Sequence, residues 1–313
     1  MSSLTNQRLH RSQRLHRSQC RAFVLLVVIG VLVVVATTLA SLVNLSLDRT
    51  RAAGERVDRL QHRWAVRSVE QTLLSAAPAV FDRQQEAWIQ TLTQENASPV
   101  PPPALVASTV VLSGQRFDVR LDDESAKLDL NRLYAVRPRD VDQRLRRGVS
   151  DPLAVRLLPS VGSSAELDGD TAVASVLPAF RSWGEVLDLS RVPAGELPTL
   201  ASSFSPVGGA SPLNLRRASD EAVEGTVAIV MGRQGAKLFL RRFRDNPTAA
   251  VDALVQTGVS NPRRRARLSK LLGTTSDTFS LWIDAGGPRG GRRYWSVVRL
   301  RREEGGSTER FVF

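Results

Sequence analysis

The stretch from Ala22 to Leu47 contains no charged residue, and its first polar side chain is Thr37. A helix needs about 20 predominantly apolar residues to cross the hydrocarbon core of a bilayer, and this stretch supplies them. A soluble core element is rarely this long and this apolar. The sequence therefore predicts a transmembrane helix over 22–47. The residues expected to form its apolar surface are Ala22, Phe23, Leu25, Leu26, Ile29 and Leu32.

The segment before this stretch is basic and predicts the orientation of the helix. Residues 1–21 contain five arginines and no acidic residue. Positively charged flanks stay in the cytoplasm, so we expect a cytoplasmic N-terminus and a periplasmic main domain. The alternative is a cleaved signal peptide, for which Ala36–Ala40 offers a fair small-residue site. The leader also contains a hexad that is repeated over 7–18 and is interpreted as a duplication in a disordered tail.

Helical spacing continues beyond the apolar stretch. Val57, Leu60 and Trp64 form one stripe, and a neighbouring stripe follows from Val66 to Leu73. We therefore expect one helix from about residue 22 to 76, in which the stripes pack on a domain. Pro78 is expected to end this helix. A second amphipathic helix is expected over 81–92.

The remainder of the chain predicts an α+β domain. A proline-rich linker is followed by alternating residues typical of antiparallel strands, with a turn at Ser113–Gly114. A helix-biased region comes next, in which Asn246–Pro247 and Asn261–Pro262 are predicted to begin helices. Ser182 is expected to cap a short helix, and Glu185 would complete a capping box. Strands return over 278–283, 294–300 and 310–313.

The residue types exclude several classes of enzyme. The three histidines lie at positions 10, 16 and 62, and the one cysteine is Cys20. A histidine-based triad, a Cys–His pair and a His-ligated zinc site are therefore excluded in the main domain. Ser125 and Lys127 are a weak candidate dyad. We expect a protein that is not an enzyme and has no small-molecule substrate.

Two charged clusters are interpreted as structural features. Adjacent acids at 122–124 should point to opposite faces in a strand, or be solvated in a turn. The basic segment from Arg263 to Lys270 is expected to be a solvated helix face. The net charge is +12. This arginine excess leaves binding to nucleic acid, anionic lipid or acidic partners open.

Four segments in order resemble the minor pseudopilin K family of type II secretion, which is type IV pilin-like. Residues 119–131, VRLDDESAKLDLN, are similar to its strand-DE-x-G-K-strand-Asn signature. Residues 179–187, AFRSWGEVL, are similar to its Phe-x-Ser-x-x-Glu-Leu segment. Residues 211–220, with Asn214 and Ala218 matching, are similar to its Asn-x-Asn-Thr-Ala-Ser segment, and residues 276–282 are similar to its Ser-x-x-Phe ending.

The resemblance implies a leader, processing and a domain order. The leader junction would be Cys20–Arg21, although the family's leader glycine is not present there. Leu25 fits the family's lack of glutamate at the fifth mature position. The implied parts are a basic cytoplasmic leader (1–21), a transmembrane helix (22–47), an exterior helix continuation with a second helix (48–95), a proline-rich linker (96–103), a strand meander (104–131), a helical insert (132–272) and C-terminal strands (273–313).

The resemblance also implies a function and partners. The chain would be a structural component at the tip of a periplasmic pseudopilus. It would be anchored in the inner membrane and would contact other pseudopilins, the inner-membrane platform, membrane lipid and prepilin peptidase. No cofactor is expected. The family can bind calcium, but the nearest acidic cluster, Glu166–Asp170, lacks the spacing of an oxygen cage. Alternatives are a single-pass envelope protein with a periplasmic binding domain and a DNA-uptake pilin.

Overall fold

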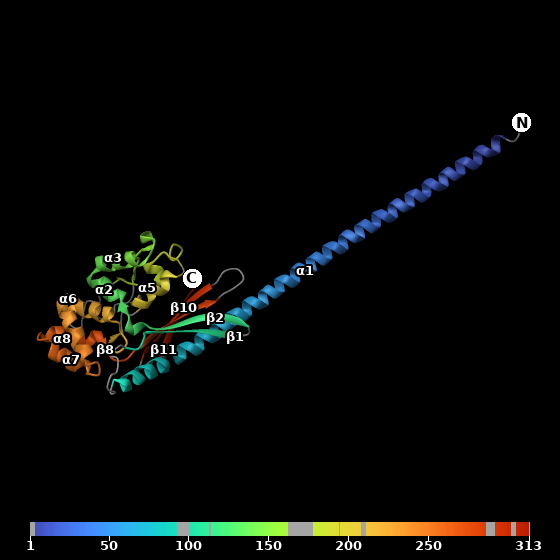
Figure 1. Ribbon diagram of the computed structural model, residues 1–313. Coiled ribbons are helices and arrows are strands. Elements are labelled where there is room, and N and C mark those ends of the chain that lie inside the picture. The colour runs from blue at the N-terminus through green and yellow to red at the C-terminus, as the bar shows by residue number, and fades with distance from the viewer. Residues whose placement is uncertain are drawn as a thin grey trace. The chain divides into compact units, whose positions relative to one another are not determined.

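The computed structural model describes residues 4–92, 101–112, 114–161, 178–193, 195–207, 211–285, 292–301 and 305–312. The chain divides into two compact units, Met1–Trp64 and Ala65–Phe313. The first unit is helical and belongs to α1, which spans Leu4–Thr91. The second unit contains the C-terminal part of α1 and every other element (Figure 1). Both hydrophobic core clusters lie in this second unit.

Helix α1 differs from the prediction at both ends. It begins at Leu4 rather than near Ala22, because the leader contains no glycine or proline that would interrupt it. It also runs through Pro78, so the predicted stop and the separate second helix are wrong. Proline removes one helical hydrogen bond, but Ala77 and Phe81 are fully buried on either side of it. Packing of this face keeps the segment helical.

A five-stranded antiparallel sheet is the centre of the second unit. Its strands are β1 (Leu105–Leu112), β2 (Gln115–Asp123), β9 (Thr278–Ala285), β10 (Arg292–Arg301) and β11 (Gly305–Val312), in the order β1-β2-β9-β10-β11. The hairpin at Gly114 is confirmed, and Gly114 has the positive φ of 75° that the turn requires. The predicted C-terminal strands are also confirmed.

Helices and short strands occupy the chain between β2 and β9. They are η1 (Glu124–Ala126), β3 (Leu128–Asp129), α2 (Leu130–Val136), α3 (Pro138–Gly148), η2 (Pro152–Ala154), β4 (Ser160–Val161), β5 (Pro178–Ala179), α4 (Trp183–Val186), α5 (Glu196–Ser203), β6 (Phe204–Ser205), β7 (Leu213–Asn214), α6 (Asp220–Asp245), α7 (Val251–Gly258), α8 (Pro262–Leu271) and β8 (Leu272–Gly273). The expected α+β class, with helices inserted into an antiparallel sheet, is confirmed.

The two faces of the sheet belong to different cores. The buried face of α1, including Val69 and Phe81, packs with Phe117, Leu281 and their neighbours on one face. On the other face, Trp282 and Trp295 stack and join the core of the helical region. The sheet is therefore covered on both sides, with strand alternation assigning each residue to one core.

Helix capping in the inserted region agrees only partly with the sequence prediction. Asn261 caps α8, and its side chain accepts from the backbone N–H of Arg263 and Arg264. Asn246 instead lies at the C-terminal end of α6, and α7 begins at Val251. Ser182 precedes α4 but its side chain makes no cap hydrogen bond, while Glu185 accepts from the N–H of Arg181.

Candidate functional site

A buried polar network lies where β2 ends and η1 begins. Asp122, Asp123 and Glu124 have exposed fractions of 0, 0 and 2 %. The expectation that the acidic turn is solvated is therefore wrong. The expectation that adjacent acids face opposite sides is confirmed, since Asp122 is in register with Ser280 and Asp123 with Phe279.

On one face of the sheet, two cations neutralise Asp122 and Glu124. Arg120 donates to both carboxylate oxygens of Asp122, from Nε at 2.6 Å and from Nη2 at 2.7 Å. Lys127 Nζ donates to Asp122 Oδ2 at 2.8 Å and to Glu124 Oε1 at 2.7 Å. Ser280 Oγ also donates to Glu124 Oε1. Such paired charges are tolerated in a core because each carboxylate has several charge-assisted donors.

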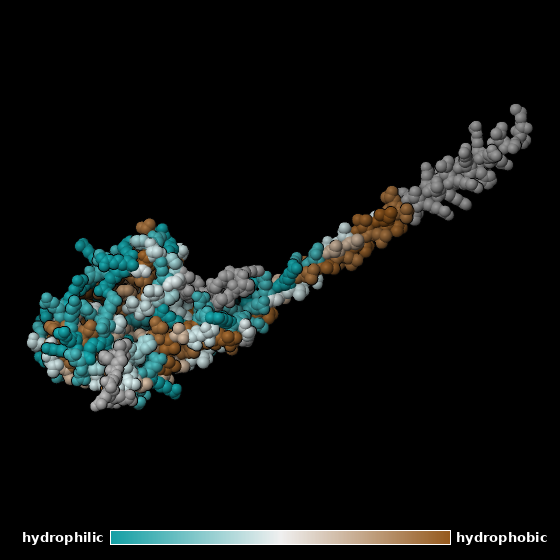
Figure 2. Space-filling view, viewed as in Figure 1, coloured by the Kyte–Doolittle hydropathy of each residue, from teal (hydrophilic) through white to brown (hydrophobic). Residues whose placement is uncertain are grey.

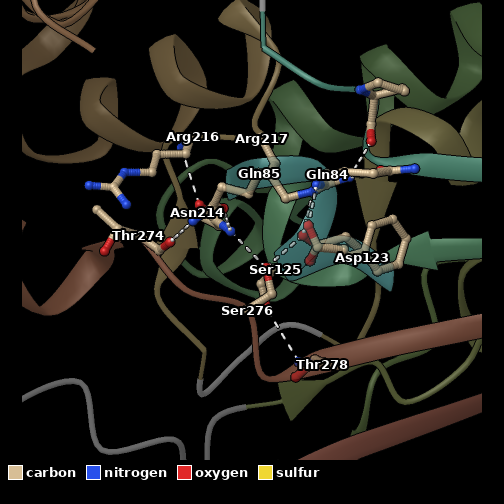
Figure 3. A network of polar contacts seen from close by, with 12 residues as sticks. Gln84, Gln85, Asp123, Ser125, Asn214, Arg216, Arg217, Thr274, Ser276 and Thr278 are labelled. Atoms are coloured by element: carbon tan, nitrogen blue, oxygen red, sulfur yellow. Dashed lines mark hydrogen bonds and ion pairs between the residues drawn. The ribbon is translucent and has the colours of Figure 1, made fainter. Parts of the chain in front are cut away.

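On the other face, Arg217 joins Asp123 to two other parts of the chain (Figure 3). Its Nε lies 3.3 Å from Asp123 Oδ2. Its other nitrogens donate to the Phe81 carbonyl at 3.0 Å, to Gln84 Oε1 at 3.0 Å and to the Pro103 carbonyl at 2.5 Å. The guanidinium also lies 4.5 Å from the centroid of the Phe81 ring. Arg217 thus connects α1, the segment before β1 and the end of β2.

Asn214 on β7 extends the network. Its Nδ2 donates to Gln85 Oε1 at 3.1 Å and to Ser276 Oγ at 2.8 Å. Ser276 Oγ in turn donates to Asp123 Oδ2 at 2.6 Å. Gln85 Nε2 donates to the Thr274 carbonyl at 3.0 Å. Side chains from α1, β2, β7 and the loop before β9 therefore form one connected set (Figure 3).

Burial has a large effect on the protonation of Asp123. Desolvation raises the pKa of this carboxyl from 3.8 to about 7, although Ser276 and Arg217 act in the opposite direction. Within the described residues, Asp123 Oδ1 is buried and has no hydrogen-bond donor. Burial also lowers the pKa of Arg217.

Each of the three buried carboxylates already contacts a cationic side chain of the protein. Three carboxylates, at 122, 123 and 124, face three cations, Arg120, Lys127 and Arg217. Over the described part of the chain, no group of three or more His, Cys, Asp or Glu side chains could hold a metal ion. The acidic cluster at 166–170 lies outside the described residues.

The structure does not assemble the candidate dyad of Ser125 and Lys127. Lys127 Nζ is bound to two carboxylates, while Ser125 Oγ donates to Asp277 Oδ1 at 3.2 Å and accepts from the Thr278 N–H. Arg263 and Lys270 are exposed on α8, which buries Leu268 and Leu271. This is the solvated basic face that the sequence predicts.

The described part of the apolar stretch is exposed along its length. Leu25, Leu26, Ile29 and Leu32 have exposed fractions of 62, 72, 52 and 61 %. Figure 2 shows the continuous hydrophobic surface on this helix. By length and composition, α1 could cross a membrane. The residues at 20–23 are helical, but their side chains lie outside the described set.

Comparisons with known proteins give a structural likeness. A scan against protein-family models and a search of curated proteins found no match. The structure is similar to a chain of the crystal structure of the GspK-GspI-GspJ complex from the enterotoxigenic Escherichia coli type 2 secretion system. The likeness has a TM-score of 0.43 and 17 % sequence identity, and it covers 85 % of this chain and 99 % of that chain.

Sequence reasoning found part of the network and missed the rest. Asp123, Asn214 and Ser276 each lie in a segment that carried the resemblance, and the structure brings all three together. Arg217 lies in the same segment as Asn214, but its burial was not foreseen. One arginine in a chain with many arginines gives no signal of being buried. Gln84 and Gln85 lie in the second helix expected over 81–92, but polar residues of an amphipathic helix give no signal of joining a buried network.

Proposed function

We propose that this chain is a minor pseudopilin-like structural component of a type II protein secretion machine. It would sit at the tip of a periplasmic pseudopilus and would have no catalytic role. The observation that carries the proposal is α1 itself. An apolar surface exposed from residue 25 to 47 and a sheet-packed segment from residue 65 belong to one helix.

The physical basis of this proposal is that such a helix has two stable environments. Before assembly, the exposed apolar surface would be embedded in the inner membrane. In a filament, the same surface would be buried against the helices of neighbouring pseudopilins. The basic leader favours a cytoplasmic N-terminus and a periplasmic main domain. The partners would then be other pseudopilins, the inner-membrane platform and membrane lipid, with prepilin peptidase acting on the leader.

The buried network supports the same proposal. Three of the four segments that resemble the pseudopilin K family supply Asp123, Asn214 and Ser276 to it. The remaining segment contributes the backbone of Phe180, which accepts from Asn131 Nδ2 at 3.0 Å, and Asn131 belongs to the first of the segments. Segments that lie far apart in the sequence, and that each resemble a segment of the pseudopilin K family, are thus connected by hydrogen bonds.

The mature N-terminus tests the proposal. Mass spectrometry of the chain purified from the membranes of its own cells should give a start at Arg21 or Ala22. A strain lacking prepilin peptidase is the control and should give a start at Met1. A start at Met1 in both strains would contradict pilin-type processing. A start near residue 41 would instead identify a cleaved signal peptide and would overturn the anchor as well.

A further inference from the structure

The second half of α6, together with α7 and α8, forms a basic lobe of the second unit, residues 232–273. This lobe contains ten arginines or lysines against two acids, Asp245 and Asp252, and its net charge is +8. The whole chain has a net charge of +12, of which the leader supplies +5, so all other residues together carry −1. Helix α8 packs against both α6 and α7, which gathers the charge in one part of the fold. Figure 2 shows hydrophilic side chains over the end of the second unit that contains these helices.

Most cations of the basic lobe have no acidic partner. Eight of the ten are exposed, and no carboxylate of the described residues forms an ion pair with any of the eight. They are Arg233, Lys237, Arg241, Arg242, Arg263, Arg264, Arg267 and Lys270. By contrast, seven of the eleven arginines over 132–217 pair with a carboxylate of the described chain. A general excess of arginine does not explain why acids are scarce in one lobe, so the lobe is suited to an anionic partner.

Helix α8 arranges three of these cations in a row. At about 100° and 1.5 Å per residue, Arg263, Arg267 and Lys270 fall within about 60° of one another and span about 10 Å along the helix axis. One strand of duplex DNA presents about three phosphates over that length. The row faces solvent, because Leu268 and Leu271 bury another side of α8 in the core. Arginine suits phosphate well, since its planar guanidinium can donate two parallel hydrogen bonds.

The composition of this surface favours one class of anionic partner. A protein interface has a centre rich in aromatic residues and poor in charge, but both aromatic residues of the lobe, Phe239 and Phe243, are buried. Within residues 232–273, all of which are described, Leu238 is the one large apolar side chain that is exposed. Single-stranded nucleic acid needs exposed rings for stacking, and a helix on a membrane surface needs an apolar face, which α8 instead buries. Protein–DNA interfaces are polar and strongly positive, as this surface is.

We propose that the basic lobe binds the phosphate backbone of double-stranded DNA without reading its sequence. Arg263, Arg267 and Lys270 would contact successive phosphates of one strand, and the cations of α6 would add to the attraction. The backbone at the start of α8 would take no phosphate, because Asn261 already accepts from the N–H groups of Arg263 and Arg264. The contacts would come from side chains, so the affinity should fall steeply with salt. This inference is independent of the proposed function.

Fluorescence anisotropy with a labelled DNA duplex of mixed sequence tests the proposal. The detergent-solubilised full chain is titrated at several salt concentrations, and the slope of log association constant against log salt reports the number of phosphate contacts. The α8 variant, Arg263→Ser with Arg267→Ser and Lys270→Ser, should reduce the magnitude of this slope by about 3 and weaken binding at low salt by at least about tenfold. The leader is present in every sample, so its contribution to binding is the same in each.

A matched control removes the same charge outside the lobe. Arg139, Arg147 and Arg181 are exposed, and none forms an ion pair with another described residue. The variant Arg139→Ser with Arg147→Ser and Arg181→Ser should therefore keep a slope and an affinity close to those of the wild type. Circular dichroism and urea unfolding should show that both triple variants are folded, because none of the six substituted side chains is buried.

Three results would overturn the proposal. One is the absence of duplex binding by the wild type, or a slope that the α8 variant leaves unchanged. Another is an equal loss of affinity in the two triple variants, which would show that net charge alone matters. The third is tighter binding of polyglutamate or of phosphatidylglycerol vesicles than of the duplex, with the same dependence on α8. That result would make an acidic protein or a membrane the occupant of the lobe.

Discussion

Asp122 and Asp123 are adjacent acids with different surroundings. Asp122 accepts two hydrogen bonds from Arg120 and one from Lys127. Asp123 has one hydroxyl donor, Ser276, and the more distant Nε of Arg217. Both side chains have no exposed area, so the number of donors decides how well the charged form is stabilised. Burial raises the pKa of Asp123 to about 7, so the charge of this carboxyl should depend on pH near neutrality.

Asp123 should make the stability of the fold depend on pH below neutrality. Its pKa in the folded chain is about 7, above the value of 3.8 for an ordinary aspartate. Between about pH 4 and 7, the folded state holds a proton that the unfolded state has released. Stability should therefore fall as pH rises through this window, by roughly 1 kcal/mol per pH unit, and level off above it.

The variant Asp123→Asn isolates this effect. Urea unfolding of the detergent-solubilised chain between pH 5 and 8 gives the difference in free energy of unfolding between the wild type and the variant. The stability of the wild type relative to Asp123→Asn should decrease up to about pH 7. Asp118→Asn is the control, because the pKa of exposed Asp118 is lowered by Thr109 and Arg116 and it stays ionised throughout. If the difference in free energy of unfolding between the wild type and Asp123→Asn did not change with pH, a pKa of about 7 for Asp123 would be contradicted.

At the scale of single residues, the local sequence predicted to which face of the sheet each acid points, but it did not predict that the acids are buried. Strand alternation correctly placed Asp122 and Asp123 on opposite faces. The partners of buried Asp123 are Arg217 and Ser276, which are about 90 and 150 residues away in the sequence. Propensity for turns describes an isolated segment, and only the tertiary fold supplies the partners that make buried acids acceptable.

At the scale of elements, α6 shows why one glycine is needed. Val223 and Val227 are buried before Gly232, and Phe239 and Phe243 after it. In a continuous helix, each residue is rotated by about 100° about the helix axis. Phe239 follows Val223 by sixteen residues, so it would point roughly 160° away, toward the opposite face. Gly232 breaks the helix with φ 73° and ψ 171°, which lets both groups reach the core. The spacing of these apolar residues in the sequence shows the same change of phase.

Substitution of Gly232 should therefore destabilise the fold through its backbone. An added Cβ would meet no atom within 4 Å, so a clash is not the cause. The conformation is one that only glycine adopts readily, and Gly232→Ala should cost roughly 1–3 kcal/mol. Gly195→Ala is a matched control, since Gly195 has open space and an ordinary right-handed conformation. Urea unfolding measures both. Equal stability of the two variants would show that the break at Gly232 carries no strain.

Other elements followed from the sequence where local signals agree with packing. Asn261 and Pro262 begin α8, and alternating segments became β1, β2, β9 and β10. The end of the strand meander expected over 104–131 became η1, the two-residue β3 and the start of α2, so that part of the prediction is wrong. Pro78 and Asn246 were misread because tertiary contacts outweighed the local signals. Burial of Phe81 continues α1 past the proline, and α6 continues up to Asn246 through the buried Phe243.

At the scale of the whole molecule, α1 carries two apolar stripes with different uses. Val66 and Val69 are buried in the core beside the sheet. Val57, Leu60 and Trp64, which were expected to pack on the domain as well, are 51, 54 and 68 % exposed. That expectation is wrong for this stripe. In the proposed assembly, this exposed stripe would be buried in addition to the apolar surface from residue 25 to 47.

Leu60→Ser combined with Trp64→Ser should separate assembly from folding. The free energy of unfolding should stay within about 0.5 kcal/mol of the wild type, because neither side chain is buried. If the chain is a pseudopilin-like component, protein secretion by cells that depend on it should be lost while its level in the membrane is kept. Leu74→Ala is the control for folding. Leu74 is buried in the core beside the sheet, so its loss should cost roughly 2–5 kcal/mol. Normal secretion by the double variant would remove this stripe from the assembly, whereas a large loss of stability would show that it packs within the chain.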